Sequence, residues 1–169
     1  MTDCQTGEIA AACQTPGQAV SPAASMREKV DRLERANCEL PQVDCPIRHY
    51  FAPGLYAREI TIPAGTTVTG AVHRTENLVV VSMGRMLIVT EDGKREVRAG
   101  DTIVCPAGMK NAVVALEDSR WTNFLANPDN ITDLDQLVEV FTESKACELL
   151  GGSQNRQLLA QEEKKKLEA

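Results

Sequence analysis

Residues 60–111 read ITIPAGTTVTGAVHRTENLVVVSMGRMLIVTEDGKREVRAGDTIVCPAGMKN, and short apolar runs alternate there with residues that form turns. The turn residues are Pro63-Ala-Gly65, Gly84, Asp92-Gly93, Gly100-Asp101 and Pro106-Ala-Gly108. Glycine tolerates the positive φ that tight turns require, and proline fixes φ. Each run between two turns has the length of a β-strand. The pattern therefore predicts a small antiparallel β-barrel, whose interior should hold a pocket.

The predicted barrel extends outward from this segment to cover residues 44–126. On its amino-terminal side, Tyr56, Arg58, Ile60 and Ile62 share one face of a strand, because side chains alternate between the two faces. Two further apolar runs before residue 126 complete the set of strands.

Two segments precede the barrel. Residues 1–24 are rich in Gln, Thr, Ala, Ser, Gly and Pro without any period, which is typical of a flexible arm. Residues 25–40 are predicted to form an amphipathic helix, which begins with the capping box Ser25-Met-Arg-Glu28. So short a helix is only marginally stable alone, so its apolar stripe must pack on the barrel or on a neighbouring subunit.

Two segments follow the barrel. Residues 131–150 are predicted to form a second helix, capped by Thr132, with an apolar stripe that includes Leu137 and Phe141. Residues 151–169 form a polar tail. Two apolar helix stripes beside one small barrel favour packing between copies, and we therefore expect a homo-oligomer.

Composition excludes several classes of protein. The chain has 169 residues and a net charge of −6, and no basic patch interleaved with aromatic residues, so we expect no nucleic-acid partner. No run approaches the roughly 18 apolar residues of a membrane span, so we expect no membrane partner. The six cysteines form no C-x-x-C pair, and no signal peptide is visible. We expect reduced thiols and a cytoplasmic protein.

The glycine and proline spacing around His73 and Asn111 resembles the two motifs of the cupin superfamily, over about residues 47–126. The resemblance implies an all-β fold, a cupin-type antiparallel barrel or jelly roll, with the N- and C-terminal helices flanking it. In metal-binding cupins, two histidines and a glutamate come from the first motif and a histidine comes from the second. Here His73 and Glu76 (or Asn77) are the only matches, and Asn111 stands at the second-motif histidine. We expect no cofactor and no metal, with His73 and Glu76 as ligands if one binds.

Three short segments also resemble small cupin-like proteins encoded in tailed-phage genomes. They are His73-Arg-Thr-Glu76-Asn77, Pro106-Ala-Gly-Met-Lys-Asn111 and Trp121-Thr-Asn123. This second resemblance implies an accessory or structural role, in the host cytoplasm or in the virion.

Polar side chains on the predicted strands are candidates for the lining of the pocket. Arginines among them favour a small anionic ligand, because guanidinium groups pair with carboxylates and phosphates. A histidine can act as a ligand, a base or an orienting donor. The candidate pocket residues are His73, Glu76, Arg58, Arg85, Asn111, Trp121 and Asn123.

Several functions remain open at this point. The leading hypothesis is a non-enzymatic, degenerate cupin that binds a small ligand or serves as a structural or assembly protein, phage-encoded in one version. The alternative is a cupin enzyme, either a metal-free isomerase or epimerase with His73 as base and Tyr50 or Tyr56 as partner, or a metal-dependent enzyme with a reduced ligand set. The sequence identifies no catalytic residue.

Overall fold

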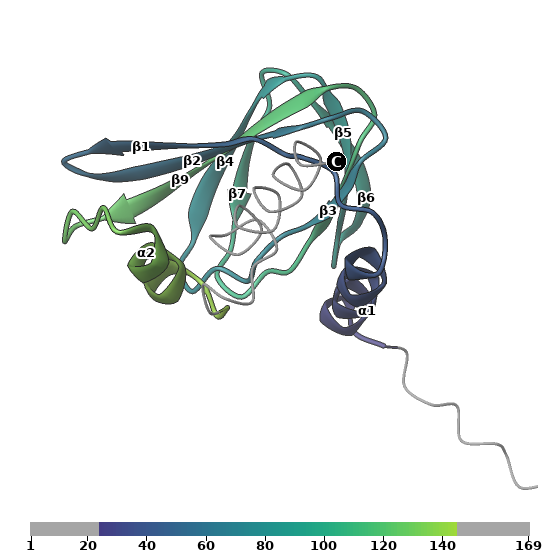
Figure 1. Ribbon diagram of the computed structural model, residues 1–169, viewed down its shortest axis with the longest axis horizontal. Coiled ribbons are helices and arrows are strands. Elements are labelled where there is room, and N and C mark those ends of the chain that lie inside the picture. Colours follow the sequence, from purple (N-terminus) through teal and green to yellow (C-terminus); the bar gives the residue numbers. More distant parts are fainter. Residues whose placement is uncertain (1–23, 145–169) are drawn as a thin grey trace, which may run out of the picture.

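The computed structural model describes residues 24–144, which form a β-barrel with one helix before it and one after it (Figure 1). The elements, in chain order, are α1 (Met26–Cys38), β1 (Ile47–Ala52), β2 (Gly54–Ile62), β3 (Thr67–Thr69), β4 (Asn77–Met83), β5 (Arg85–Thr90), β6 (Gly93–Arg98), β7 (Thr102–Cys105), β8 (Ala112–Ala115), β9 (Ser119–Asn127) and α2 (Leu134–Phe141). Within these residues, no helix is both long enough and apolar enough to span a membrane.

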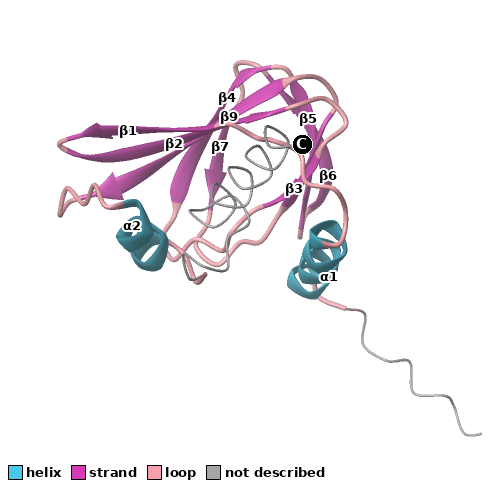
Figure 2. Ribbon diagram, in the orientation of Figure 1, coloured by secondary structure: helices cyan, strands magenta, loops and turns pink. Residues whose placement is uncertain are grey.

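The strands form two antiparallel sheets that face each other (Figure 2). One sheet has the order β1-β2-β9-β4-β7 and the other has the order β3-β8-β5-β6. Neighbours in each sheet are mostly distant in the sequence, which is the connectivity of a jelly roll. The predicted fold, an all-β cupin-type barrel flanked by helices, is confirmed.

The main core fills the space between the two sheets. Val79 and Val81 point inward from β4, and Met86 and Ile88 point inward from β5, each exposed by 1% or less. Every second residue of these strands is therefore buried, as alternation along a half-buried strand requires. The glycine between the two strands, Gly84, carries the chain from one sheet to the other.

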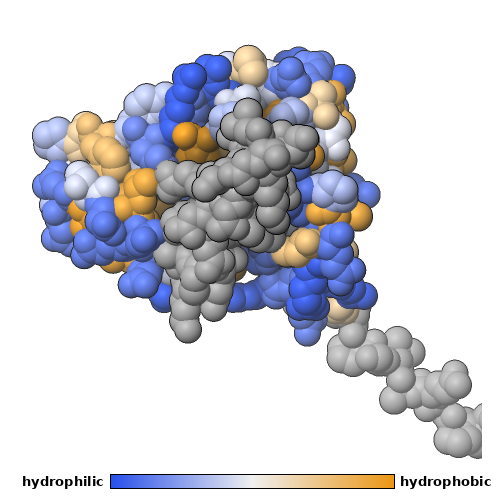
Figure 3. All heavy atoms as spheres, viewed as in Figure 1, coloured by the Kyte–Doolittle hydropathy of each residue, from blue (hydrophilic) through white to orange (hydrophobic). Residues whose placement is uncertain are grey.

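The β1–β2 hairpin projects beyond the barrel, and α2 lies next to it (Figure 1). A second apolar cluster joins the two elements and consists of Tyr56, Leu125, Leu137 and Phe141. Apolar side chains also gather on the surface over this hairpin, at the left-hand end of Figure 3. The described residues thus form two apolar clusters, one inside the barrel and one between the hairpin and α2.

Helix α1 begins with the predicted capping box, in which Ser25 and Glu28 exchange hydrogen bonds. Its stripe packs on the chain's own barrel, since Val30 is only 2% exposed. Lys110, which lies just before β8, holds the helix in place. Its ammonium group lies 3.1 Å from Asp31 and 2.5 Å from Glu34, and its side chain is 10% exposed.

Helix α2 begins one residue later than the predicted cap. Asp133, rather than Thr132, is the N-cap, and its carboxylate accepts a hydrogen bond from the Gln136 amide. The helix ends at Phe141, where the chain becomes extended and pairs with the segment around His73. Of the predicted range 131–150, residues from 145 onward lie outside the described part of the chain, as do the predicted arm and tail.

Candidate functional site

Inward-facing residues of the five-stranded sheet form rows across the strands. In one row His49 pairs with Arg58, and Arg58 pairs with Asn123. The row on one side of it contains Tyr56 and Leu125, and the row on the other contains Ile60 and Trp121. A polar row therefore lies between the two apolar clusters, which we call the polar belt (His49, Arg58 and Asn123).

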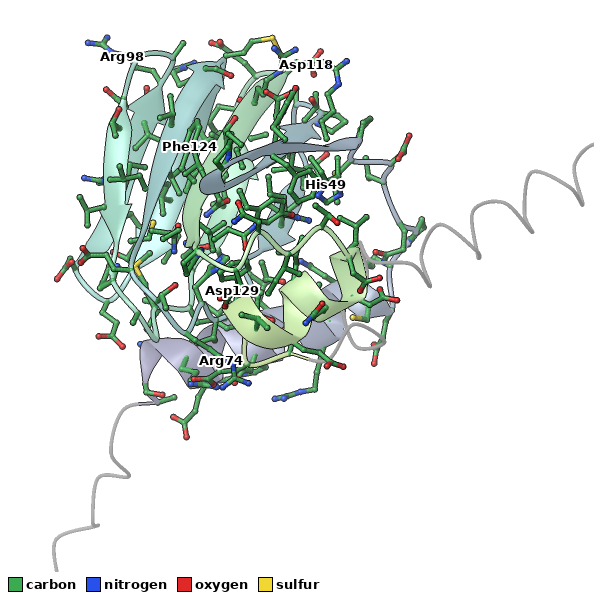
Figure 4. All side chains as sticks on the ribbon, turned by 90° about the vertical axis from the view of Figure 1, so that its left-hand side faces the viewer. His49, Arg74, Arg98, Asp118, Phe124 and Asp129 are labelled. Carbon is green, nitrogen blue, oxygen red and sulfur yellow. The ribbon has the colours of Figure 1, made fainter. Side chains whose placement is uncertain are left out.

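The polar belt faces a cavity of about 1160 Å³. The cavity lies between the two sheets and is bounded by α2, by residues 40–46 after α1, and by the loop that carries His73. Figure 4 shows Arg98 and Asp118 at one end of the barrel and Arg74, the neighbour of His73, at the other end near α2. Of the predicted pocket residues, the structure places five along this cavity: Arg58, His73, Asn111, Trp121 and Asn123.

Arg58 brings a positive charge to the cavity, and no carboxylate of residues 24–144 balances it. Among the described residues, its guanidinium group makes no ion pair and no hydrogen bond. Burial lowers the pKa of Arg58, but a guanidinium group remains protonated at neutral pH. A partly buried cation without a counter-ion is unfavourable, so the site favours an anion.

His73 is held at the mouth of the cavity by its backbone. Its carbonyl accepts a hydrogen bond from the Gly108 amide at 2.8 Å, and its strand segment pairs with Thr142 after α2. The Nδ1 atom is buried and has no hydrogen-bond partner among the described residues. Burial, and then the charge of Arg58, lower the pKa of His73 to about 4, so the imidazole is neutral at pH 7.

Trp121 and Asn123 belong to a closed hydrogen-bond network. The Trp121 indole donates to the Asn123 carbonyl oxygen at 2.8 Å, and the Asn123 amide donates to the Asn77 carbonyl oxygen at 2.9 Å. The Asn77 amide donates in turn to the Thr75 backbone carbonyl. These groups satisfy one another, so the network fixes the shape of the cavity wall and leaves few donors for a ligand.

Asn111 lines the cavity opposite Gly70. The two backbones are joined by a hydrogen bond of 3.0 Å, and a Cβ atom at position 70 would lie 2.6 Å from the Asn111 side-chain oxygen. Only glycine fits there without moving that side chain. The Asn111 amide makes no hydrogen bond within residues 24–144, so it is available to a ligand.

A second histidine reaches the same cavity. His49 Nδ1 lies 2.8 Å from the Tyr56 hydroxyl, and both side chains line the cavity. Burial raises the pKa of Tyr56, so the phenol remains protonated at neutral pH. The other predicted partner, Tyr50, is 47% exposed and its hydroxyl reaches Glu59 outside the barrel.

Two of the predicted pocket residues lie elsewhere. Arg85 is exposed and pairs with Glu96 and Glu117, each at 3.2 Å, because its strand turns Met86 inward instead. Glu76 is exposed in the loop before β4 and does not line the cavity, because the next residue, Asn77, is the one that points inward. The predictions that place Arg85 and Glu76 in the pocket are therefore wrong.

The residues present do not fit the four-ligand metal site that the cupin resemblance implies. His73 and Glu76 are not brought together, and Asn111 is a poor substitute for a histidine ligand. In the described part of the chain, no group of three or more His, Cys, Asp or Glu side chains lies close enough to hold a metal ion. Cys45 and Cys105 line the cavity as free thiols, and burial raises the pKa of each.

His49 lies within the predicted barrel but is not among the predicted pocket residues. The hairpin of β1 and β2 brings it next to Arg58. The sequence does indicate a role for Asn77. This residue begins a nearly continuous apolar strand, and an amide buried there needs a hydrogen-bond partner.

Comparison with known proteins finds similar folds among solved structures. KdgF from Halomonas sp. is 23% identical, with a TM-score of 0.45, over 57% of this chain and 92% of that one. A cupin superfamily protein from Desulfitobacterium hafniense is 12% identical, with a TM-score of 0.42, over 52% and 83%. The Cupin_2 domain of an XRE family transcriptional regulator from Enterobacter cloacae is 12% identical, with a TM-score of 0.44, over 50% and 97%. No protein-family model and no curated protein matches the chain.

Proposed function

We propose that this protein binds a small organic anion in the barrel cavity and does so without catalysing a reaction on it. The observation that carries the proposal is Arg58, a cation that faces the cavity with no acidic partner among the described residues. The Asn111 side-chain amide and the neutral imidazole of His73 also line the cavity. Together they supply the few convergent polar groups that ligand pockets combine with apolar walls.

The single tryptophan of the chain gives the test. Trp121 lines the cavity, so its fluorescence should change when a ligand enters. We expect organic carboxylates to change this fluorescence and their uncharged amides to do so at least tenfold more weakly. Arg58→Gln should abolish the difference between acid and amide.

Arg48→Gln is the matched control. Arg48 lies on the neighbouring strand of the same sheet, but its side chain is 68% exposed and faces Glu59 rather than the cavity. This variant should bind like the unaltered protein. A complete lack of response to carboxylates, or equal binding by Arg58→Gln, would overturn the proposal.

A metal-free proton-transfer enzyme is the second candidate, favoured by the hydrogen bond between His49 and Tyr56. With Arg58 holding the carboxylate of a bound acid, a neutral phenol and an imidazole can remove and return a proton at the carbon next to that carboxylate. Proton NMR of a bound acid in D₂O would measure exchange at its carbon α to the carboxylate. Exchange that disappears in Tyr56→Phe would make this the leading function.

A structural or assembly role, including one in a phage particle, stays a prediction. It is compatible with ligand binding, since the cavity and the outer surfaces are separate parts of the barrel.

A further inference from the structure

The cavity has an apolar floor next to its charged anchor. Four partly buried residues pack on the main core and also line the cavity: Cys45, Ile60, Val68 and Met109. We call these four the apolar floor. Beneath it lie fully buried residues of the same core, such as Ile62 and Val113. Ile62 and Val113 also line the cavity, but they are almost completely buried, whereas the four residues of the floor are partly exposed.

Arg58 lies at one edge of the apolar floor. Along β2 the inward residues are Tyr56, Arg58, Ile60 and Ile62, so the guanidinium group is followed directly by aliphatic side chains. On the neighbouring strand β9, Asn123 lies opposite Arg58 and Trp121 lies opposite Ile60. The Trp121 indole donates a hydrogen bond to the Asn123 side-chain oxygen. Arg58 therefore lies between the apolar floor and the second apolar cluster, whose members also line the cavity, so an aliphatic chain attached to a carboxylate at Arg58 meets apolar side chains.

This distribution selects among organic anions. A sugar acid or a polycarboxylate would place hydroxyl or charged groups on the apolar floor, where they would lose water without gaining hydrogen bonds. An aliphatic chain would instead cover the floor and gain from leaving water. A single carboxylate can meet Arg58 through two parallel N–H···O bonds.

We propose that the ligand is an amphipathic monocarboxylate, whose carboxylate pairs with Arg58 and whose aliphatic chain covers the apolar floor. This inference rests on the proposed function and narrows it to one chemical class. In this proposal Arg58 causes the preference for an anion, and the apolar floor causes the dependence on chain length, so the two effects can be tested separately.

The test is a ladder of straight-chain carboxylates from acetate to octanoate, titrated into the full chain and followed by Trp121 fluorescence. We expect the dissociation constant to fall about threefold to fourfold for each added methylene, as burial of a CH₂ group predicts. Octanamide should bind at least tenfold more weakly than octanoate. Citrate and gluconate should bind no better than acetate.

Two variants separate charge from chain length. Arg58→Gln should remove the preference for octanoate over octanamide and keep the dependence on chain length. Val68→Ser, at a partly buried position of the floor, should keep the charge preference and reduce the gain per methylene. Circular dichroism of each variant shows whether it is folded, and Arg48→Gln again serves as the control.

The outcomes distinguish the two proposals. If carboxylates bind with no dependence on chain length, or if gluconate or citrate binds more tightly than octanoate, the amphipathic ligand is wrong and the anion site stands. If no carboxylate of any length binds, the proposed function itself is wrong.

Discussion

At the scale of single residues, two groups give the cavity its chemical character. Arg58 supplies a charge without a counter-ion, and His73 supplies a buried ring nitrogen without a hydrogen-bond partner in the described residues. The Arg58 charge also acts on His73, since it contributes to lowering the pKa of the imidazole to about 4. Burying either group without a partner lowers the stability of the fold. Such unfavourable groups are common at functional sites.

His73 should make the protein less stable as the pH falls. The pKa of His73 is about 4 in the folded chain and 6.5 in the unfolded chain, so between these values only the unfolded chain binds the proton. The free energy of unfolding should therefore fall through this window by up to about 3 kcal/mol, at about 1.4 kcal/mol per unit of pKa. Urea unfolding at pH 7, 5.5 and 4.5 measures the effect, and His73→Gln should flatten it.

Arg58→Gln provides an independent check on the same prediction. Removing the guanidinium charge should raise the pKa of His73, although burial still keeps it below 6.5. NMR titration of the imidazole would measure the change. An ordinary pKa near 6.5 in the unaltered protein would contradict the burial of this side chain.

At the scale of elements, the turn between β4 and β5 decides how the two sheets close around the cavity. Gly84 has a φ of +74°, and a Cβ atom there would lie 2.2 Å from the Asp118 backbone oxygen. The turn is therefore restricted twice, by the left-handed backbone and by the close approach of the chain before β9. The strand β4 also has an irregular register with β9 between Val81 and Met83, next to this turn.

Gly84→Ala should destabilise the protein more than Gly65→Ala. Both glycines have nearly the same φ, +74° and +77°, but position 65 has no atom within 4 Å of the added Cβ. Gly65→Ala should cost about 1–2 kcal/mol, the usual penalty for a left-handed alanine. Gly84→Ala should exceed this by at least about 2 kcal/mol because the backbone must move. Equal midpoints of thermal unfolding in the two variants would show that the contact is not restrictive.

At the scale of the whole molecule, the outer face of the five-stranded sheet is the apolar surface without a partner in the described structure. Tyr50 pairs with Ala57, Ala57 with Phe124, Phe124 with Leu78, and Leu78 with Val104, so one apolar row crosses all five strands. Tyr50, Leu78 and Val104 are 47%, 47% and 57% exposed. The apolar stripes of α1 and α2, by contrast, pack on the chain's own barrel.

Self-association stays a prediction, and this apolar row is where we expect it. A specific interface takes about 800 Å² from each partner around an apolar centre, and a row across five strands can form such a centre. Sedimentation velocity should show an oligomer that Leu78→Lys weakens at least tenfold. Leu116→Lys, at a residue 41% exposed just after β8 in the other sheet, should leave it unchanged. A monomer at all concentrations would contradict the prediction.

The sequence alone determined the strands, the turns and the face that Arg58 shares with Tyr56, Ile60 and Ile62. These are local properties, because alternation along a strand fixes the face of each residue and glycine marks most of the positive-φ turns. The tertiary structure decided which residues share the cavity. Pairing of β2 with β9 brought Arg58 next to Asn123, and the residue after α2, Thr142, pairs with His73. Pairing between strands distant in sequence depends on how the apolar faces of both sheets pack together, and no local pattern contains that information.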